Sequence, residues 1–264
     1  MRVIVTRPLR EGQRWVRELA DAGLSAVVLP LIDIRPADDP APVHTAWQRL
    51  GDYAGVMFVS ANAVDGFFAS RPADASSFGA NDAIKTRAWA TGPGTTAALR
   101  RAGVPAECVD APAADAVQFD SEALWQRVGK TVQPGQRVLI VRGGDAQNGS
   151  AAQGIGRDWF AVRLAQAGAA VDFVVSYQRA RPQLDAAQGQ LAREAAADGS
   201  VWLFSSSEAL ANLLANVPEQ DWHAACAVAT HPRIATAARQ AGFGTVLESR
   251  PALTDIRASI ESIQ

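Results

Sequence analysis

Short apolar runs alternate with amphipathic stretches along most of this chain. Apolar residues of the stretch after residue 10, such as Trp15, Val16, Leu19 and Ala22, recur at helical spacing, and Gly23 suits the end of a helix. The apolar runs themselves are nearly continuous, as parallel strands covered on both faces require. The pattern predicts an α/β protein with parallel sheets. Predicted strands include residues 3–6, 55–60, 88–91, 137–142, 201–206 and 226–230.

Three of the predicted strand–helix units occur twice, in the same order. "LADAGLSAVVL" resembles "LAQAGAAVDFVV", "MFVSANAV" resembles "LFSSSEAL", and "TGPGTTAALRRAGV" resembles "THPRIATAARQAGF". The first pair aligns Gly23 with Gly168, and the third aligns Gly103 with Gly242. The repetition predicts two homologous domains, against the alternative that strand–turn–helix units resemble one another by chance.

Two proline-marked segments occupy matching places in the two copies, "DIRPADDPAP" at 33–42 and "SYQRARPQ" at 176–183. Proline interrupts regular structure and favours extended chain. If both segments are linkers, at about 36–40 and 176–182, one domain is 40–176 and the other joins 1–36 to 181–264. Such a pair would be hinged, with a cleft of the kind that binds ligands. The alternative is two consecutive domains divided near residue 130.

Composition narrows the classes of function. The 264 residues carry a net charge of −2, without the basic excess typical of nucleic-acid binding. The two cysteines, Cys108 and Cys226, have no metal-binding spacing and indicate thiols in a reducing compartment. No apolar run approaches the ~20 residues of a membrane span. We therefore expect a soluble cytoplasmic protein without metal, nucleic-acid or membrane partners.

The stretch "WATGPGTTAALRRAGV" matches the dinucleotide pattern G-x-G-x-x-G/A at Gly92, Gly94 and Ala97, and Asp110 follows at the position of a ribose-binding carboxylate. Its counterpart, "THPRIATAARQAGF", lacks the loop glycines. The two copies share a helix N-terminus, where free N–H groups and the helix dipole favour an anion. We therefore interpret the loop as an anion-binding turn, with an NAD-dependent oxidoreductase as an alternative.

The ordered set of motifs resembles the uroporphyrinogen-III synthase family over nearly the whole chain: "VTRP", "VMFVSANAV", "TGPGTTAALRRAG", "VLIVRGG", "SYQRARP", "LFSSSEAL" and "HPRIATAARQAG". The resemblance implies two flavodoxin-like α/β domains joined by a two-strand linker. It implies cyclisation of hydroxymethylbilane to uroporphyrinogen III, with loss of water and inversion of ring D. It also implies a monomer without cofactor or metal. Transient contact with the preceding pathway enzyme is a further possibility that the sequence leaves open.

The implied substrate carries carboxylates, which suit helix N-termini and arginine side chains. Four turns begin helices directly after strands, and Arg7 and Arg142 each close the first strand of their copy. The alternatives are simple helix capping for the turns and domain packing for the arginines. The predicted substrate-binding residues are Arg7, Ser60, Ala61, Asn62, Gly92, Gly94, Thr95, Thr96, Arg142, Ser206, Ser207, His231 and Arg233.

Tyr177 is the predicted catalytic residue, because it matches the tyrosine of the family's crossing segment that assists departure of the hydroxyl group. A phenol can donate a hydrogen bond or proton to a leaving oxygen. The alternative is a tyrosine that only packs at a hinge.

Ile234 departs from family members that have a hydroxyl residue there, which argues against side-chain catalysis from the fourth turn. The polar segment 143–157 is expected to be a surface loop or a lid. The competing function is a non-enzymatic two-domain receptor for a small molecule.

Overall fold

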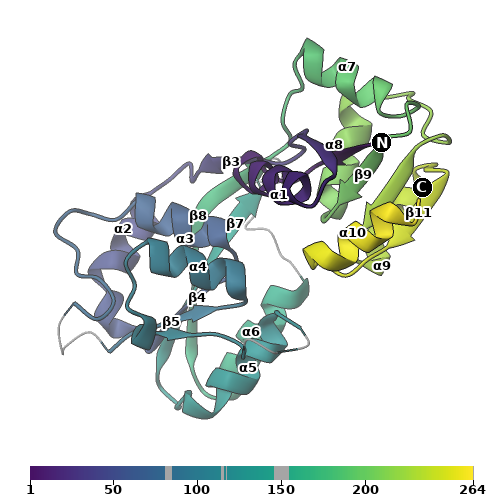
Figure 1. Ribbon diagram of the computed structural model, residues 1–264. Helices are drawn as coiled ribbons and strands as arrows, with labels where there is room; N and C mark the ends of the chain where they lie inside the picture. Colours follow the sequence, from purple (N-terminus) through teal and green to yellow (C-terminus); the bar gives the residue numbers. More distant parts are fainter. Residues whose placement is uncertain (81–84, 114–115, 117, 146–154, 264) are drawn as a thin grey trace. The chain divides into compact units, whose positions relative to one another are not determined.

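The computed structural model describes residues 1–80, 85–113, 116, 118–145 and 155–263. The chain divides into two compact units. The first unit joins Met1–Asp33 to Ala180–Gln264, and the second unit is Ile34–Arg179 (Figure 1). Within the described residues, no helix combines the length and apolar character needed to cross a membrane.

The first unit contains a five-stranded sheet in the order β11-β10-β9-β1-β2, with every neighbouring pair parallel. Its strands are β1 (Arg2–Val5), β2 (Ser25–Val28), β9 (Val201–Phe204), β10 (Cys226–Ala229) and β11 (Thr245–Glu248). Its helices are α1 (Leu9–Asp21), α7 (Ala186–Glu194), α8 (Ser207–Asn216), α9 (Pro232–Gln240) and α10 (Leu253–Glu261).

Alternate residues of the strands in the first unit face opposite sides of the sheet. Val201 and Leu203 of β9 pack in one core cluster with Trp15 of α1 and Ile256 of α10, so α1 and α10 cover that face. Trp202 and Phe204 point the other way and stack on each other. They make edge-on contacts with Trp222 and Phe243 of the following segments. Both faces are therefore buried, as the continuous apolar runs predicted.

The second unit contains a six-stranded sheet in the order β3-β8-β7-β4-β5-β6. Its strands are β3 (Asp33–Pro36), β4 (Gly55–Phe58), β5 (Arg87–Ala90), β6 (Val109–Asp110), β7 (Arg137–Asp145) and β8 (Ala170–Ala180). Its α-helices are α2 (Ala41–Gln48), α3 (Ala61–Ala69), α4 (Pro93–Arg101), α5 (Ser121–Val128) and α6 (Ile155–Gln166). Three short 3-10 helices occupy Leu50–Asp52, Ala106–Cys108 and Gly129–Thr131.

Two core clusters cover the two faces of the second sheet. On one face, side chains of α2, α3 and α4 surround Phe58 and Val141, with Trp47 and Phe67 stacked at 4.5 Å between ring centroids. On the other face, side chains of α5 and α6 pack over Met57 and the neighbouring strands. The helices lie on both sides of the strands (Figure 1), so the predicted α/β fold with parallel sheets is confirmed.

The two sheets have the same strand order once the repeated segments are superposed. The order β11-β10-β9-β1-β2 of the first unit corresponds to β6-β5-β4-β7-β8 of the second. The glycines aligned from the sequence also agree in conformation. Gly23 and Gly168 have φ values of +83° and +82°, and Gly103 and Gly242 have +85° and +92°. This left-handed conformation, which suits glycine, ends a helix before the next strand in each copy and supports the repeat.

The two crossings between the units lie just before the first predicted linker, 36–40, and within the second, 176–182. The division falls between Asp33 and Ile34 and between Arg179 and Ala180. Residues 33–36 form strand β3, and β8 continues to Ala180, so part of each proline-marked segment belongs to the sheet. Proline is compatible with a strand at the edge of a sheet, and β3 is the edge strand here.

Candidate active site

Ser60 and Tyr177 lie together at the carboxyl edge of the second unit's sheet, although β7 separates the two strands from which they come. Ser60 follows β4 and is the N-cap of α3, where its Oγ accepts a hydrogen bond of 3.2 Å from the N–H of Ala63. The hydroxyl of Tyr177, near the end of β8, lies 3.3 Å from the same Oγ. The structure therefore joins a predicted binding residue to the predicted catalytic residue, although 117 positions separate them.

Tyr177 is held tightly and is only 6% exposed. It pairs with Gly143 of β7, just after a register shift between Arg142 and Gly143. A Cβ atom on Gly143 would lie 2.5–2.8 Å from three atoms at the hydroxyl end of the tyrosine ring. The phenol ring thus occupies space that only glycine leaves open, and its hydroxyl is directed to Ser60.

The turn from Gly92 to Thr96 opens α4 without a side-chain cap. Pro93 carries no N–H, and the N–H of Thr96 donates to the carbonyl of Gly92 at 3.0 Å. No acceptor is recorded among the described residues for the N–H groups of Gly94 and Thr95, which are the donors of an anion-binding helix N-terminus. Gly94 is open to solvent, whereas the side chain of Thr95 is buried. Thr95 can therefore contribute its backbone more readily than its hydroxyl.

A partly apolar groove of about 500 Å³ lies beside this turn, and the sequence analysis did not predict it. Pro93 and Ala97 of α4 form one wall, and Arg100 lies one turn further along the helix. Phe119 supplies an exposed ring that also touches the position of a Cβ on Gly92. Phe119 comes from an irregular segment without periodicity, so no pattern in the sequence indicates it. The groove offers a flat apolar surface next to free N–H donors and a cation.

Arg142 lies in β7 beside the Tyr177 site. It is 8% exposed, and its guanidinium carbon stands 4.4 Å above the ring of Phe173, a cation–π distance. The predicted alternative for Arg142 was domain packing. Its burial against an exposed aromatic ring of the same unit holds the charge in one place, and this contact does not test packing between domains.

Arg7 is the corresponding residue of the first unit, two positions after β1. Its side chain is 18% exposed, stands over Trp15 at 4.6 Å and contacts Glu11 at 3.5 Å. Burial lowers the pKa of Arg7, and Glu11 opposes this shift. Its Nε has no hydrogen-bond partner among the described residues. A half-satisfied guanidinium of this kind is suited to a carboxylate ligand.

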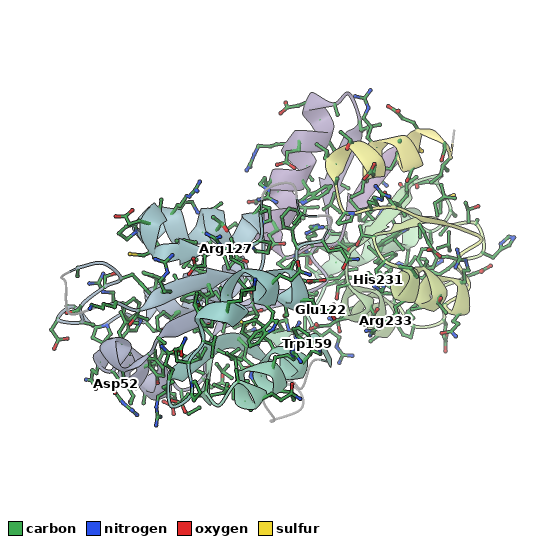
Figure 2. All side chains as sticks on the ribbon, turned by 90° about the horizontal axis from the view of Figure 1, so that it is seen from below. Asp52, Glu122, Arg127, Trp159, His231 and Arg233 are labelled. Carbon is green, nitrogen blue, oxygen red and sulfur yellow. The ribbon has the colours of Figure 1, made fainter. Side chains whose placement is uncertain are left out.

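The turns that begin α8 and α9 behave differently from each other. Ser206 caps α8, accepting from the N–H of Glu208 at 3.1 Å, and this leaves the N–H of Ser207 in the first turn. In α9, the Nδ1 of His231 accepts from the N–H of Arg233 at 3.1 Å, and its carbonyl accepts from the next N–H at 2.9 Å. The free backbone donors expected at this turn are therefore absent among the described residues from Pro232 to Ile234. His231 acts as a helix cap, while the exposed guanidinium of Arg233 remains available (Figure 2).

The dinucleotide interpretation of the glycine loop requires Asp110 to be available for a ribose, and it is not. Asp110 forms two contacts of 2.7 Å with Arg87, so its carboxylate is already paired.

Among the described residues, no group of three His, Cys, Asp or Glu side chains could hold a metal ion. The predicted lid or surface loop at 143–157 lies largely outside the described residues, since only its ends belong to β7 and α6.

Comparisons with known proteins agree with one another. The family model of uroporphyrinogen-III synthase HemD matches residues 13–256. A uroporphyrinogen-III synthase of Chlorobaculum parvum is 34% identical over 143 residues, which span 53% of this chain and about half of that protein (52%). The solved uroporphyrinogen-III synthetase of Helicobacter pylori covers all of both chains at a TM-score of 0.58 and 14% identity. A mutant synthase from Thermus thermophilus, at 0.53 and 14%, covers 100% of this chain and 98% of its own. The structural likenesses show the shared fold, and the family match shows that this chain belongs to the uroporphyrinogen-III synthase family.

Proposed function

We propose that this protein is a uroporphyrinogen-III synthase, which closes the linear tetrapyrrole hydroxymethylbilane into uroporphyrinogen III. The observation that supports this most directly is local. In a chain of this family, the Tyr177 hydroxyl lies 3.3 Å from Ser60, at the sheet edge where the uncapped N-terminus of α4 also begins. The carboxyl edge of this sheet thus combines a proton donor, Tyr177, with backbone N–H groups that can bind carboxylates.

The reaction is mainly a problem of positioning. The reactive end of the substrate closes without help onto the far ring, giving the unrotated isomer, so the enzyme must hold the chain in the geometry of the inverting closure. A difference of ~1.4 kcal/mol between the two closures already gives a tenfold preference. Fixed hydrogen-bond donors can supply this difference without a strongly activated nucleophile.

Tyr177 assists the loss of water in this proposal. Because Ser60 Oγ accepts the N–H of Ala63, its own proton can be directed at the phenol oxygen. The proton of Tyr177 is then free to be donated to the departing hydroxyl group, whose C–O bond breaks as water forms. Ser60 acts as a positioning residue in this arrangement.

Each unit has donors that suit the carboxylates of the proposed substrate. In the second unit the proposed donors are the backbone of Ala61, Asn62, Gly94 and Thr95, with Gly92 and Thr96 shaping the turn and Arg142 adding charge. In the first unit they are Arg7, Arg233 and the turn of Ser206 and Ser207, with His231 holding the start of α9 in place. Action in the cytoplasm as a monomer, without cofactor and with transient contact to the preceding enzyme, is part of the same proposal.

The decisive experiment is incubation of the protein with freshly prepared hydroxymethylbilane, followed by separation of the product isomers. We expect uroporphyrinogen III at a rate that scales with protein concentration. Only the unrotated isomer, at the rate seen without protein, would refute the proposal. Saturable binding of hydroxymethylbilane without any acceleration would instead favour the non-enzymatic receptor.

A further inference from the structure

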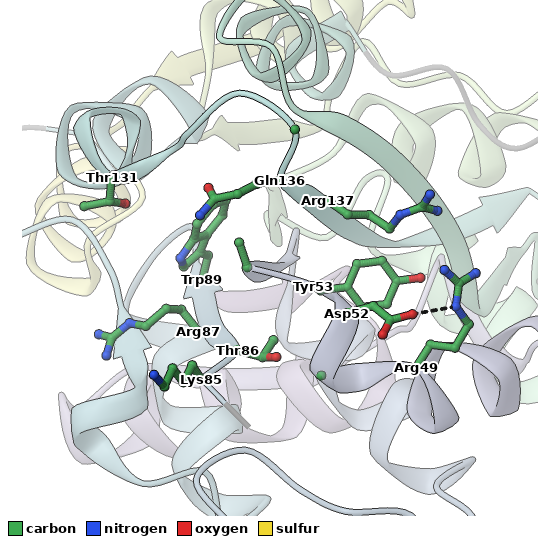
Figure 3. Close-up of a pocket in the computed structure, with 13 residues that line it drawn as sticks. Arg49, Asp52, Tyr53, Lys85, Thr86, Arg87, Trp89, Thr131, Gln136 and Arg137 are labelled. Atoms are coloured by element: carbon green, nitrogen blue, oxygen red, sulfur yellow. Dashed lines mark hydrogen bonds and ion pairs between the residues drawn. The ribbon is translucent and has the colours of Figure 1, made fainter. Parts of the chain in front are cut away.

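A second pocket of about 640 Å³ opens at the opposite edge of the second unit's sheet. Strands β4, β5 and β7 begin there, at Gly55, Arg87 and Arg137, whereas Ser60 and Gly92 follow the carboxyl ends of β4 and β5. In Figure 3 the side chains that line the pocket surround a common space. Because the strands separate this edge from Tyr177, the proposed reaction gives the pocket no role.

Cations dominate the lining of this basic-edge pocket. Arg49, Lys85, Arg87 and Arg137 line it, against the single carboxylate of Asp52. Each arginine is anchored by a carboxylate: Arg49 by Asp52 at 2.9 Å, Arg87 by Asp110 at 2.7 Å and Arg137 by Asp172 at 2.9 Å. Counting those three carboxylates against the four cations leaves one positive charge in excess.

Lys85 supplies that excess charge. It is exposed and has no partner among the residues that the structure describes. The anchored arginines also have N–H groups left for a ligand. In their hydrogen bonds to carboxylates, Arg49 uses only Nε and Arg137 uses only one terminal nitrogen. Hydrogen bonds to Asp110 raise the pKa of Arg87, which keeps its guanidinium charged. The pocket thus presents several pre-positioned donors and a free cation.

Trp89 adds a donor that points to a ligand. Its side chain is 2% exposed, and its indole N–H has no hydrogen-bond partner among the described residues. The nitrogen faces the space between Arg87, Thr131 and Gln136 (Figure 3). A buried donor without an acceptor carries an uncompensated desolvation cost, so an acceptor that reaches it is favoured. To reach this N–H, an oxygen of the ligand would have to displace a neighbouring side chain. The side chain in question is that of Gln136, which is half-buried at the pocket wall.

The sequence keeps this indole in place through Gly55. A Cβ atom on Gly55 would lie 2.5–2.8 Å from three atoms of the six-membered ring of Trp89. The ring therefore occupies space at the start of β4 that is open because that position has no side chain. Tyr53, also buried, lines the pocket and donates to Asp172 at 3.2 Å. Two buried aromatic side chains with cations beside them are a fixed feature of this edge.

We propose that the basic-edge pocket binds a small organic anion whose carboxylate or phosphate oxygens accept from Trp89 and pair with Lys85 and the anchored arginines. The donors spread around the pocket favour a ligand with several carboxylates over a bare inorganic ion. This site is separate from the proposed substrate-binding turns, and the inference does not depend on the synthase activity.

The test follows the indole N–H resonance of Trp89 in a ¹⁵N-labelled full-length chain, assigned by its loss in Trp89→Phe. The probes are benzene-1,3,5-tricarboxylate and inorganic phosphate. We expect a saturable shift of this resonance with both probes, at lower concentration for the aromatic one. Lys85→Ala should weaken binding about fivefold, in the range of one exposed ion pair.

Arg193→Ala is the matched control, because Arg193 is an equally exposed cation on α7 of the first unit. It should leave the dissociation constants unchanged. The proposal fails if the Trp89 resonance does not shift up to about 20 mM of either probe. It also fails if saturable shifts are confined to the Gly92–Thr96 turn, or if Lys85→Ala and Arg193→Ala behave alike.

Discussion

Ser60 makes two contacts that serve different purposes. One is a helix cap to the N–H of Ala63, and the other is the contact with the hydroxyl of Tyr177. The sequence could indicate each residue separately, Ser60 from its place before a helix and Tyr177 from its family motif. It could not show that they meet, because side-chain contacts between distant segments depend on strand register. Phe119 and Arg100 were missed for a similar reason, since no local pattern marks a groove.

Removal of the Tyr177 hydroxyl should separate catalysis from folding. In Tyr177→Phe the ring still fills the space opposite Gly143, so we expect the free energy of unfolding to change by no more than about 1 kcal/mol. Turnover of hydroxymethylbilane should fall at least tenfold, since a proton donor contributes about 10²-fold or more. Steady-state kinetics and thermal unfolding measure the two effects. Wild-type turnover in the folded variant would remove Tyr177 from the mechanism.

Ser60→Ala should lower stability and turnover together. Loss of the cap should cost about 1 kcal/mol, and loss of the contact with Tyr177 should reduce kcat severalfold. Asp185→Ala is the matched control, because Asp185 caps α7 through a hydrogen bond from Gln188 and lies in no proposed site. It should show the same loss of stability with unchanged kcat. Equal kcat in both variants would leave Ser60 as a cap only.

Arg7→Met should raise KM without destabilising the protein. Methionine retains contact with Trp15, and removal of a largely buried charge relieves its desolvation cost. We expect KM to rise about tenfold, the loss of one carboxylate contact, while the melting temperature stays level or rises. Arg14→Met removes an exposed arginine of the nearby helix α1 and should change neither quantity. A large loss of stability with an unchanged KM would assign Arg7 to packing.

At the scale of elements, the apolar runs predicted the inner strands well. Strands such as β4, β9 and β10 are buried on both faces, so their sequences are continuous and easily identified. Strand β3 lies in the segment 33–42, whose prolines predicted a crossing between domains. It forms only because β8 offers a free edge, and that information lies in tertiary structure.

The register shift between β7 and β8 places Gly143 opposite Tyr177 and so positions the tyrosine ring. Gly143→Ala would place a methyl group within 2.5–2.8 Å of the phenol, so the ring must move. We expect a loss of about 1–3 kcal/mol in stability and a fall in kcat beyond that of Ser60→Ala. Gly189→Ala in α7 is the control, since the nearest atom to its added methyl is the flexible Arg193 side chain at 3.5 Å. This control should be slightly stabilised and fully active.

At the scale of the whole molecule, the second unit is continuous in sequence and the first is not. Residues 34–179 hold both core clusters of their sheet, so we expect this fragment to fold alone. Circular dichroism and cooperative urea unfolding would test this. The fragment 1–179 should gain no further protected amides, because β1 then lacks β9. An unfolded 34–179 fragment would contradict the independence of the unit.

The pairing of β1 with β9 also sets an order of events during synthesis. Val3 pairs with Val201, so β1 cannot complete its sheet until the segment around Val201 has also been made. At about 5–20 residues per second, that wait is on the order of 10–40 s. The second unit is complete before then, and it ends in the adjacent strands β3 and β8. Its folding draws the distant pieces of the first unit close together, which shortens the effective loop and lowers the entropy cost of joining them. If the second unit folded slowly in the nascent chain, the apolar strand Arg2–Val5 would stay exposed for longer. Aggregation would then compete with folding.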